Sequence, residues 1–166
     1  MSIDPSTLPY RPCVGLMVLN RRGEAWVGRR IGSPNQGHLS AFWQMPQGGI
    51  DDGEAPAAAA KRGLFEETGI RGAEIIAESR DWLPYDLPPE LLGKIWGGKY
   101  RGQIQRWFAL RFTGNDREIN IDPANHEREF IEWRWAALDE LPRLIVPFKR
   151  DVYSKVIAEF RHLASG

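Results

Sequence analysis

Glutamates between residues 54 and 67 have the types and spacing that metal-assisted phosphate chemistry requires. Positions 63, 66 and 67 lie three and four residues apart, so on a helix they share one side. Two of these positions are Glu66 and Glu67, and neighbouring carboxylates repel one another unless a divalent cation is present. Mg²⁺ and Mn²⁺ prefer such hard oxygen ligands and also bridge phosphate groups. A metal held there would polarise a water molecule for attack on phosphorus.

The wider segment, residues 48–70, reads GGIDDGEAPAAAAKRGLFEETGI and resembles the Nudix box, G-x5-E-x7-R-E-U-x-E-E-x-G-U, where U is bulky and aliphatic. A glutamate pair alone is usually a solvated helix face, but eight of nine fixed positions match here over 23 residues. The matching residues are Gly48, Glu54, Arg62, Leu64, Glu66, Glu67, Gly69 and Ile70. The resemblance implies that Glu54 and Arg62 support the site, and we expect them to pair across the loop–helix junction.

Gly63 breaks the box, because the family has a metal-binding and catalytic glutamate at this position. Glycine inside a helix costs roughly 1 kcal/mol relative to alanine, so helix stability does not explain it. Loss of a metal ligand worth several kcal/mol would slow turnover on the order of a thousandfold. Two explanations stay open: an engineered replacement that traps substrate, which a single break in an intact box favours, or a naturally weak or repurposed protein.

The flanking stretches YRPCVG, WQMPQGGID, YDLP and VPFKRDVY resemble bacterial RNA pyrophosphohydrolases and the related dinucleoside polyphosphate hydrolases. This resemblance implies substrate-binding roles for five residues. Arg11 and Lys149 would hold phosphate oxygens, Arg30 and Phe148 would sandwich a base, and Gln47 would lie near the metals. The alternative for Phe148 is a place in the core, and for Arg11 a solvated strand edge.

The same resemblance implies a metal centre of Mg²⁺ or Mn²⁺, with two or three ions in the presence of substrate. The backbone carbonyl of Gly48 would complete the coordination by Glu66 and Glu67, and Glu129 matches a distant glutamate ligand of this branch. Glu127 and Glu132 are alternatives to Glu129. His38, His126 and His162 share no ligand spacing with Cys13, so we expect no zinc site.

The periodicity of apolar residues predicts the elements that position these side chains. We expect strands over 13–19, 25–29, 73–78, 105–112 and 131–136, and helices over 55–68 and 149–163. Residues 51–53 would cap the first helix and Gly69 would end it, with a packing face of Ala57, Ala60 and Leu64. The last helix would bury Val152, Tyr153, Val156, Ile157 and Phe160. Residues 31–42 and 82–102 read as loops, the second with a short helix at 89–92. The expected fold is α/β: a Nudix α/β/α sandwich around a central mixed β-sheet.

Composition limits the class of protein. A length of 166 residues fits a single domain, 1–166. Lys and Arg number 22 and Asp and Glu number 22, so the basic surplus typical of duplex-DNA binding is missing. No apolar stretch is long enough to span a membrane, and the single cysteine favours a reducing compartment, hence the cytoplasm.

Three functions remain open at this point. The leading hypothesis is a metal-dependent pyrophosphohydrolase that acts on 5′-triphosphorylated RNA or on dinucleoside polyphosphates such as diadenosine tetraphosphate. The rival is a catalytically silent protein that binds nucleotides or RNA 5′ ends on the same scaffold, which Gly63 favours. Another Nudix substrate, such as a nucleotide sugar, is disfavoured by the flanking stretches.

Overall fold

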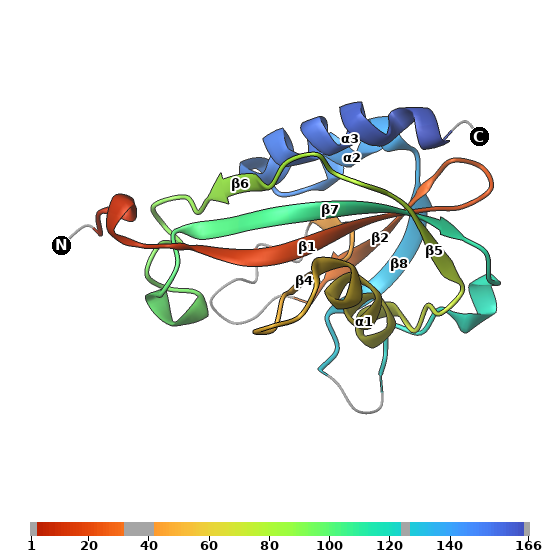
Figure 1. The fold of residues 1–166 in the computed structure, drawn as a ribbon, viewed down its shortest axis with the longest axis horizontal. Coiled ribbons are helices and arrows are strands. Elements are labelled where there is room, and N and C mark those ends of the chain that lie inside the picture. Colours follow the sequence, from red (N-terminus) through yellow and green to blue (C-terminus); the bar gives the residue numbers. More distant parts are fainter. Residues whose placement is uncertain (1–2, 32–41, 124–126, 165–166) are drawn as a thin grey trace.

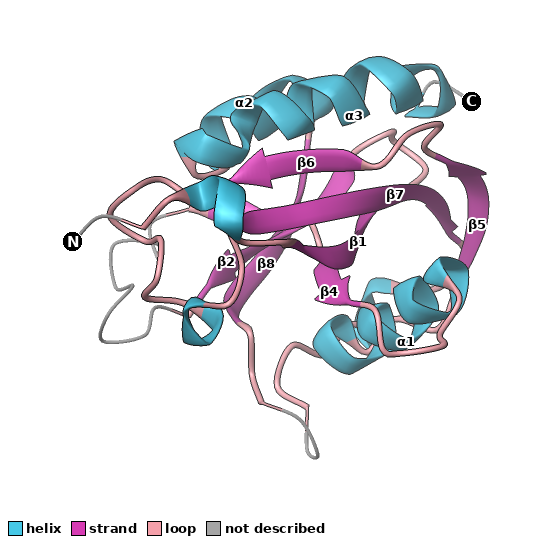
Figure 2. Cartoon of the chain, turned by 60° about the vertical axis from the view of Figure 1, so that its left-hand side comes forward, coloured by secondary structure: helices cyan, strands magenta, loops and turns pink. Residues whose placement is uncertain are grey.

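A computed structural model describes residues 3–31, 42–123 and 127–164. The strands form one eight-stranded sheet, and helices cover both of its faces (Figures 1 and 2). The α/β/α sandwich predicted from the sequence is therefore confirmed. The strands are β1 Tyr10–Leu19, β2 Ala25–Arg30, β3 Trp43–Gln44, β4 Gln47–Gly49, β5 Ala73–Glu78, β6 Leu83–Asp86, β7 Gly102–Phe112 and β8 Phe130–Ala136, and the α-helices are α1 Pro56–Thr68, α2 Leu141–Leu144 and α3 Arg150–Ala164.

Strand β1 organises the sheet. It runs parallel to β7 along ten consecutive residue pairs, from Tyr10 opposite Gly102 to Leu19 opposite Arg111. Its other edge is shared by β4 and β2, both antiparallel. β8 extends the sheet beyond β2, while β5 and β6 pair with opposite ends of β7. The sheet is mixed, as predicted.

Side chains that alternate along β1 divide the core into two layers. Val14, Leu16 and Val18 pack toward α1, in a cluster that includes Ala60 and Leu64. Met17 and Leu19 pack on the opposite face, in the cluster that holds the buried side of α3. An unbroken apolar run such as CVGLMVL is what a strand covered on both faces needs.

Helix α1 spans almost the residues that the sequence indicated, but the capping of its first turn and its packing face differ from the prediction. Gly69 ends the helix in the left-handed conformation, with φ of 73°. No side chain caps the first turn, so the predicted cap at 51–53 is wrong; the backbone N–H of Asp51 instead donates to Glu54 Oε1 at 3.0 Å. Ala57 is exposed, and Ala59 takes the buried position assigned to it.

The segment 82–102 is more ordered than predicted. It contains strand β6, which the prolines of DWLPYDLPP obscured in the sequence, and β7 begins at Gly102 rather than at residue 105. Residues 89–92 form a hydrogen-bonded turn instead of a helix, with the N–H groups of Leu91 and Leu92 donating to the carbonyl of Pro88. Of the loop predicted over 31–42, only the two end residues are described.

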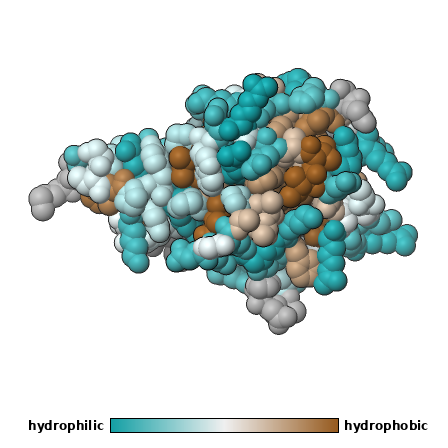
Figure 3. All heavy atoms as spheres, viewed as in Figure 1, coloured by the Kyte–Doolittle hydropathy of each residue, from teal (hydrophilic) through white to brown (hydrophobic). Residues whose placement is uncertain are grey.

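Most of the surface seen in Figure 3 is polar, and apolar atoms gather toward the side where β5 lies in Figure 1. β5 alternates half-buried and exposed residues, among them Ile76 at 36% exposure. Throughout the described ranges, no helix combines the length and apolar character needed to cross a membrane.

The predicted buried face of α3 is confirmed, and Tyr153 on that face also makes a polar contact. Its hydroxyl accepts a hydrogen bond from the backbone N–H of Met45 at 2.8 Å, which ties α3 to the segment that leads into β4.

Replacing Tyr153 by phenylalanine should leave that buried N–H without a partner. We expect Tyr153→Phe to lower the free energy of unfolding by about 1–3 kcal/mol, measured by urea denaturation. The matched control is Tyr10→Phe, which removes an exposed hydroxyl bonded to Asp86 and should change stability little. Equal effects of the two substitutions would contradict the structural role of the Tyr153 hydroxyl.

Candidate functional site

A pocket of about 510 Å³ collects side chains from segments far apart in the sequence. Its walls are the start of β1, the end of β2, β4, one side of α1, the start of β7, the segment 85–96 and the short 3-10 helix Pro147–Lys149. Among the predicted site residues, only Glu54 does not line it. The others are Arg11, Arg30, Gln47, Gly48, Arg62, Gly63, Glu66, Glu67, Glu129, Phe148 and Lys149.

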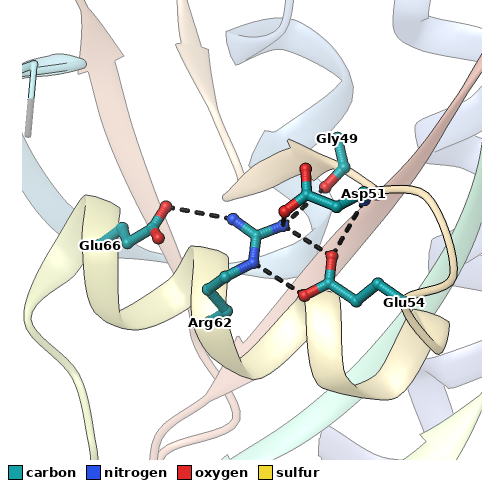
Figure 4. Close-up of polar contacts among 5 residues, drawn as sticks. All are labelled: Gly49, Asp51, Glu54, Arg62 and Glu66. Carbon is teal, nitrogen blue, oxygen red and sulfur yellow. Dashed lines mark hydrogen bonds and ion pairs between the residues drawn. The ribbon is translucent and has the colours of Figure 1, made fainter.

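Arg62 fixes the loop that precedes α1 against the helix (Figure 4). Its guanidinium donates to both carboxylate oxygens of Glu54, at 2.8 and 2.9 Å, and to the carbonyl of Gly49 at 3.1 Å. These hydrogen bonds from Arg62 lower the pKa of Glu54 to about 2. A further bond of 3.2 Å to Glu66 links the brace to the helix surface that faces the pocket. The predicted pairing of Glu54 and Arg62 is thus present in the structure.

Glu67 carries a carboxylate that hydrogen bonds satisfy only in part. Its Oε2 is buried and has no hydrogen-bond partner within the described ranges. Desolvation, reinforced by the negative charge of Glu129, raises the pKa of Glu67 well above its ordinary value. A buried carboxylate oxygen of this kind is stable as an anion only when a cation approaches it.

Gly63 lies one turn before Glu67, on the same side of α1. A Cβ atom built at Gly63 would meet no other atom within 4 Å, so a side chain would extend into open space. Position 63 therefore has room for the glutamate that the box pattern places there. The described residues contain no group of three or more acidic, histidine or cysteine side chains arranged to hold a metal ion.

The oxygen donors of the pocket are of the type that a hard divalent cation binds, although the described residues do not gather three of them into a formed site. Glu66, Glu67 and Glu129 line one pocket with Gly48, whose Cβ position would be 3.8 Å from Glu67 Oε1. All of these donors are oxygens, the ligands of Mg²⁺ and Mn²⁺. The two alternatives to Glu129 fit less well: Glu132 is paired with Arg29 at 2.6 Å, and Glu127 does not line the pocket.

Cationic side chains occupy the rest of the pocket. Lys149 is only 5% exposed, and its Nζ lies 3.4 Å from Gln47 Oε1. Burial, with a smaller effect from Arg30, lowers the pKa of Lys149 to about 7. The Nε of Arg30 is buried without a hydrogen-bond partner in the described parts of the chain. A bound anion would therefore stabilise Lys149 and Arg30, since it would replace the water that each cation loses on burial.

Aromatic residues line the same pocket. Phe148 packs on Tyr85, with ring centroids 5.7 Å apart. Trp96 lies beside Arg11, whose guanidinium is 5.8 Å from the indole ring, and has an unusual positive φ of 52°. Lys94, Trp96 and Gln103 were not predicted as site residues. The length of the predicted 82–102 loop was the available signal for Lys94 and Trp96, because long loops are often functional.

A family model described as NUDIX domain matches residues 9–156. The chain belongs to the Nudix family. Among curated Nudix relatives, the RNA pyrophosphohydrolase of Agrobacterium fabrum is 56% identical over 168 residues, covering 99% of each chain. The RNA pyrophosphohydrolase of Brucella abortus (strain 2308) is 56% identical over 167 residues, 98% of this chain and 94% of the relative. These matches make the chain a Nudix hydrolase, of the class that acts on phosphoanhydride bonds.

Solved structures support the Nudix fold. The Escherichia coli dihydroneopterin triphosphate pyrophosphohydrolase has a TM-score of 0.66 at 16% identity, with 91% of this chain and 99% of that chain covered. An Ap4A hydrolase binary complex from Caenorhabditis elegans has a TM-score of 0.59 at 15% identity, with 90% and 98% covered. At such identities the likeness concerns the fold alone.

The raised pKa of Glu67 predicts that its charge destabilises the metal-free Nudix domain. Glu67 ionises near pH 4.5 in the unfolded chain but only at a higher pH in the folded chain. The free energy of unfolding therefore falls as the pH rises above 4.5. We expect Glu67→Gln to raise the free energy of unfolding at pH 8 in EDTA by about 1–3 kcal/mol and to have less effect at pH 5. Thermal and urea denaturation measure both values.

With added Mg²⁺ the native chain should become more stable than Glu67→Gln, because the ion stabilises the native chain and not the variant. The matched control is Glu74→Gln at an exposed position, which should keep the pH dependence and the Mg²⁺ stabilisation of the native chain, because Glu67 is intact. A loss of stability by Glu67→Gln in EDTA would show that the carboxylate has a partner.

Lys149 should destabilise the folded chain most at low pH, where its buried amino group is charged. Its pKa is about 7 when folded against an ordinary 10.5, so the cost of its buried charge is complete below pH 7 and fades as the pH rises to 10.5. Lys149→Met should therefore raise the free energy of unfolding at pH 6, by at most about 5 kcal/mol, with a smaller gain at pH 9. The exposed Lys155, changed to methionine, should show no such dependence; a pH-independent gain at position 149 would contradict the shifted pKa.

Proposed function

We propose that this Nudix hydrolase is a metal-dependent pyrophosphohydrolase that removes pyrophosphate from 5′-triphosphorylated RNA and also accepts dinucleoside polyphosphates such as diadenosine tetraphosphate. One observation carries the proposal. A single pocket combines the unpartnered carboxylate oxygen of Glu67 with the underpartnered cations Arg30 and Lys149. A polyphosphate with its divalent cation satisfies both kinds of group at once. The names of the Agrobacterium and Brucella relatives support the RNA substrate.

Each side chain then has a distinct role. Glu66, Glu67, Glu129 and the Gly48 carbonyl hold Mg²⁺ or Mn²⁺, which supplies charge neutralisation and a more acidic water molecule. The metal ligands stay in register because the Arg62–Glu54 brace holds the loop of Gly48 against α1.

Substrate binding falls to a second group of residues in the pocket. Arg11 and Lys149 bind phosphate oxygens, and Gln47 lies between Lys149 and the metal-binding loop. Arg30 and Phe148 hold a base by stacking, an interaction worth about 1–3 kcal/mol that tolerates any base. We further propose that residues 1–166 act as one domain in the cytoplasm.

Gly63 favours a second candidate function. Without a carboxylate at this position, the pocket keeps its residues for binding phosphate and a nucleobase. It lacks one metal ligand, which is also the group that would accept a proton from the attacking water. The same geometry then serves a protein that binds nucleotides or RNA 5′ ends without hydrolysing them.

Restoring the carboxylate separates the two functions. We expect Gly63→Glu to raise Mg²⁺-dependent turnover on the order of a thousandfold, since the new side chain extends into open space. The assay follows pyrophosphate release from 5′-triphosphorylated RNA, and ATP or AMP release from diadenosine tetraphosphate. The faster substrate identifies the main activity, and a nucleotide sugar assayed in parallel tests the remaining Nudix substrate class.

Gly63→Ala is the matched control, because it gains helix propensity without a carboxylate. It should become slightly more stable and stay slow. If Gly63→Glu binds substrate and remains as slow as Gly63→Ala, the hydrolase proposal fails and the binding function replaces it.

A further inference from the structure

A chain of buried hydrogen bonds runs from the core to the pocket. The indole N–H of Trp107 donates to Gln105 Oε1 at 2.9 Å. The amino group of Gln105 donates to Gln103 Oε1 at 2.8 Å and to Gln47 Oε1 at 3.2 Å. Gln103 and Gln105 are 2% and 1% exposed, and Trp107 is fully buried. Amide groups therefore link this part of the core to the pocket wall.

The chemistry of the indole fixes the donor-to-acceptor direction of this series of hydrogen bonds. An indole N–H can only donate, so Gln105 must turn its oxygen toward Trp107 and its amino group away. Gln47 and Gln103 must then turn their oxygens inward to accept from that amino group. A second donor agrees with this order from the other side, because Lys149 Nζ also approaches Gln47 Oε1, at 3.4 Å.

The amino groups of Gln47 and Gln103 are left facing the pocket. Both residues line it, and neither amino group has a hydrogen-bond partner within 3–31, 42–123 and 127–164. Neither belongs to the fully buried atoms that lack a partner, so each keeps some exposed surface, and both residues line the pocket. The wall thus offers neutral N–H donors beside its cations.

We propose that Gln103 is a further substrate-binding residue, whose amino group donates to a phosphate oxygen, and that Gln105 and Trp107 are positioning residues that keep the amides of Gln103 and Gln47 in the donating orientation. The inference rests on the proposed function, which supplies the polyphosphate. Phosphate oxygens only accept hydrogen bonds, so a flipped amide would present an oxygen and repel them. The Trp107 indole excludes that flip.

Inorganic tripolyphosphate with Mg²⁺ is the probe, because it carries the phosphate chain without a base. Calorimetry on the full chain should show about tenfold weaker binding by Gln103→Met. Gln105→Met should weaken binding to a similar extent, although Gln105 does not line the pocket. The combined variant should lose less than the product of the two effects, because Gln105 acts partly through Gln103. Gln103→Asn, which withdraws the amino group, should follow Gln103→Met and serves if the methionine variant fails to fold.

Side-chain NMR gives a readout that a loss of packing would not produce. In ¹⁵N-labelled native chain, tripolyphosphate should shift the amide resonances of Gln47 and Gln103. In Gln105→Met the same resonances should split or broaden as the amides sample both orientations. Ser79→Ala is the structural control, since the Ser79 hydroxyl bonds the backbone of Trp107 at 3.0 Å and does not touch the glutamines. It should reduce stability and leave tripolyphosphate affinity unchanged.

The outcomes separate the two proposals. Unchanged affinity of Gln103→Met and Gln105→Met, in a native chain that binds tripolyphosphate, overturns this inference alone. A loss of affinity by Ser79→Ala as large as theirs also overturns it, because packing would then explain the effect. A native chain that binds neither tripolyphosphate nor 5′-triphosphorylated RNA overturns the proposed function and this inference with it.

Discussion

Charge buried without a matching partner is the constraint around which this protein is organised. A carboxylate oxygen of Glu67, a guanidinium nitrogen of Arg30 and the ammonium of Lys149 are all withdrawn from water at one place. Each costs free energy, and Arg30 only partly offsets the charge of Glu67, because burial still raises the pKa of that carboxyl. The fold has to supply enough apolar burial elsewhere to hold them there.

The two core layers supply that apolar burial and also position the charged side chains of the pocket. α1 is fixed against one face of the sheet by Ala59, Ala60 and Leu64, and α3 against the other by a full amphipathic face. The acidic residues of the pocket come largely from the α1 side, whereas Lys149 and Phe148 come from the approach to α3. The pocket therefore lies where elements from both layers reach the sheet.

Local patterns in the sequence predicted the elements whose side chains repeat at a helical or strand period, which is why the buried face of α3 and the strands β1, β5 and β8 were found. Strand β4 was not predicted because a Gly-Gly pair carries no apolar pattern. Strand β6 was not predicted because a proline such as Pro84 is typical of loops. The box and the flanking stretches named the candidate site residues, but could not rank them. Sequence cannot tell that Glu67 is the carboxylate with a buried oxygen while Glu66 bonds Arg62, since the difference depends on how α1 packs. Nor can it find Gln103, whose orientation is set by an indole four residues further along the strand.

The parallel pairing of β1 with β7 has a consequence for how the chain reaches this state in a cell. Tyr10 finds its partner Gly102 only after 92 further residues have been made, which takes roughly 5–20 s at ordinary rates of bacterial and eukaryotic synthesis. During that interval the most apolar strand of the protein has one edge unpaired on the nascent chain. Such non-local pairing folds slowly and is prone to association with other chains. The central strand that makes the finished sheet stable is therefore also the segment most in need of protection on the ribosome.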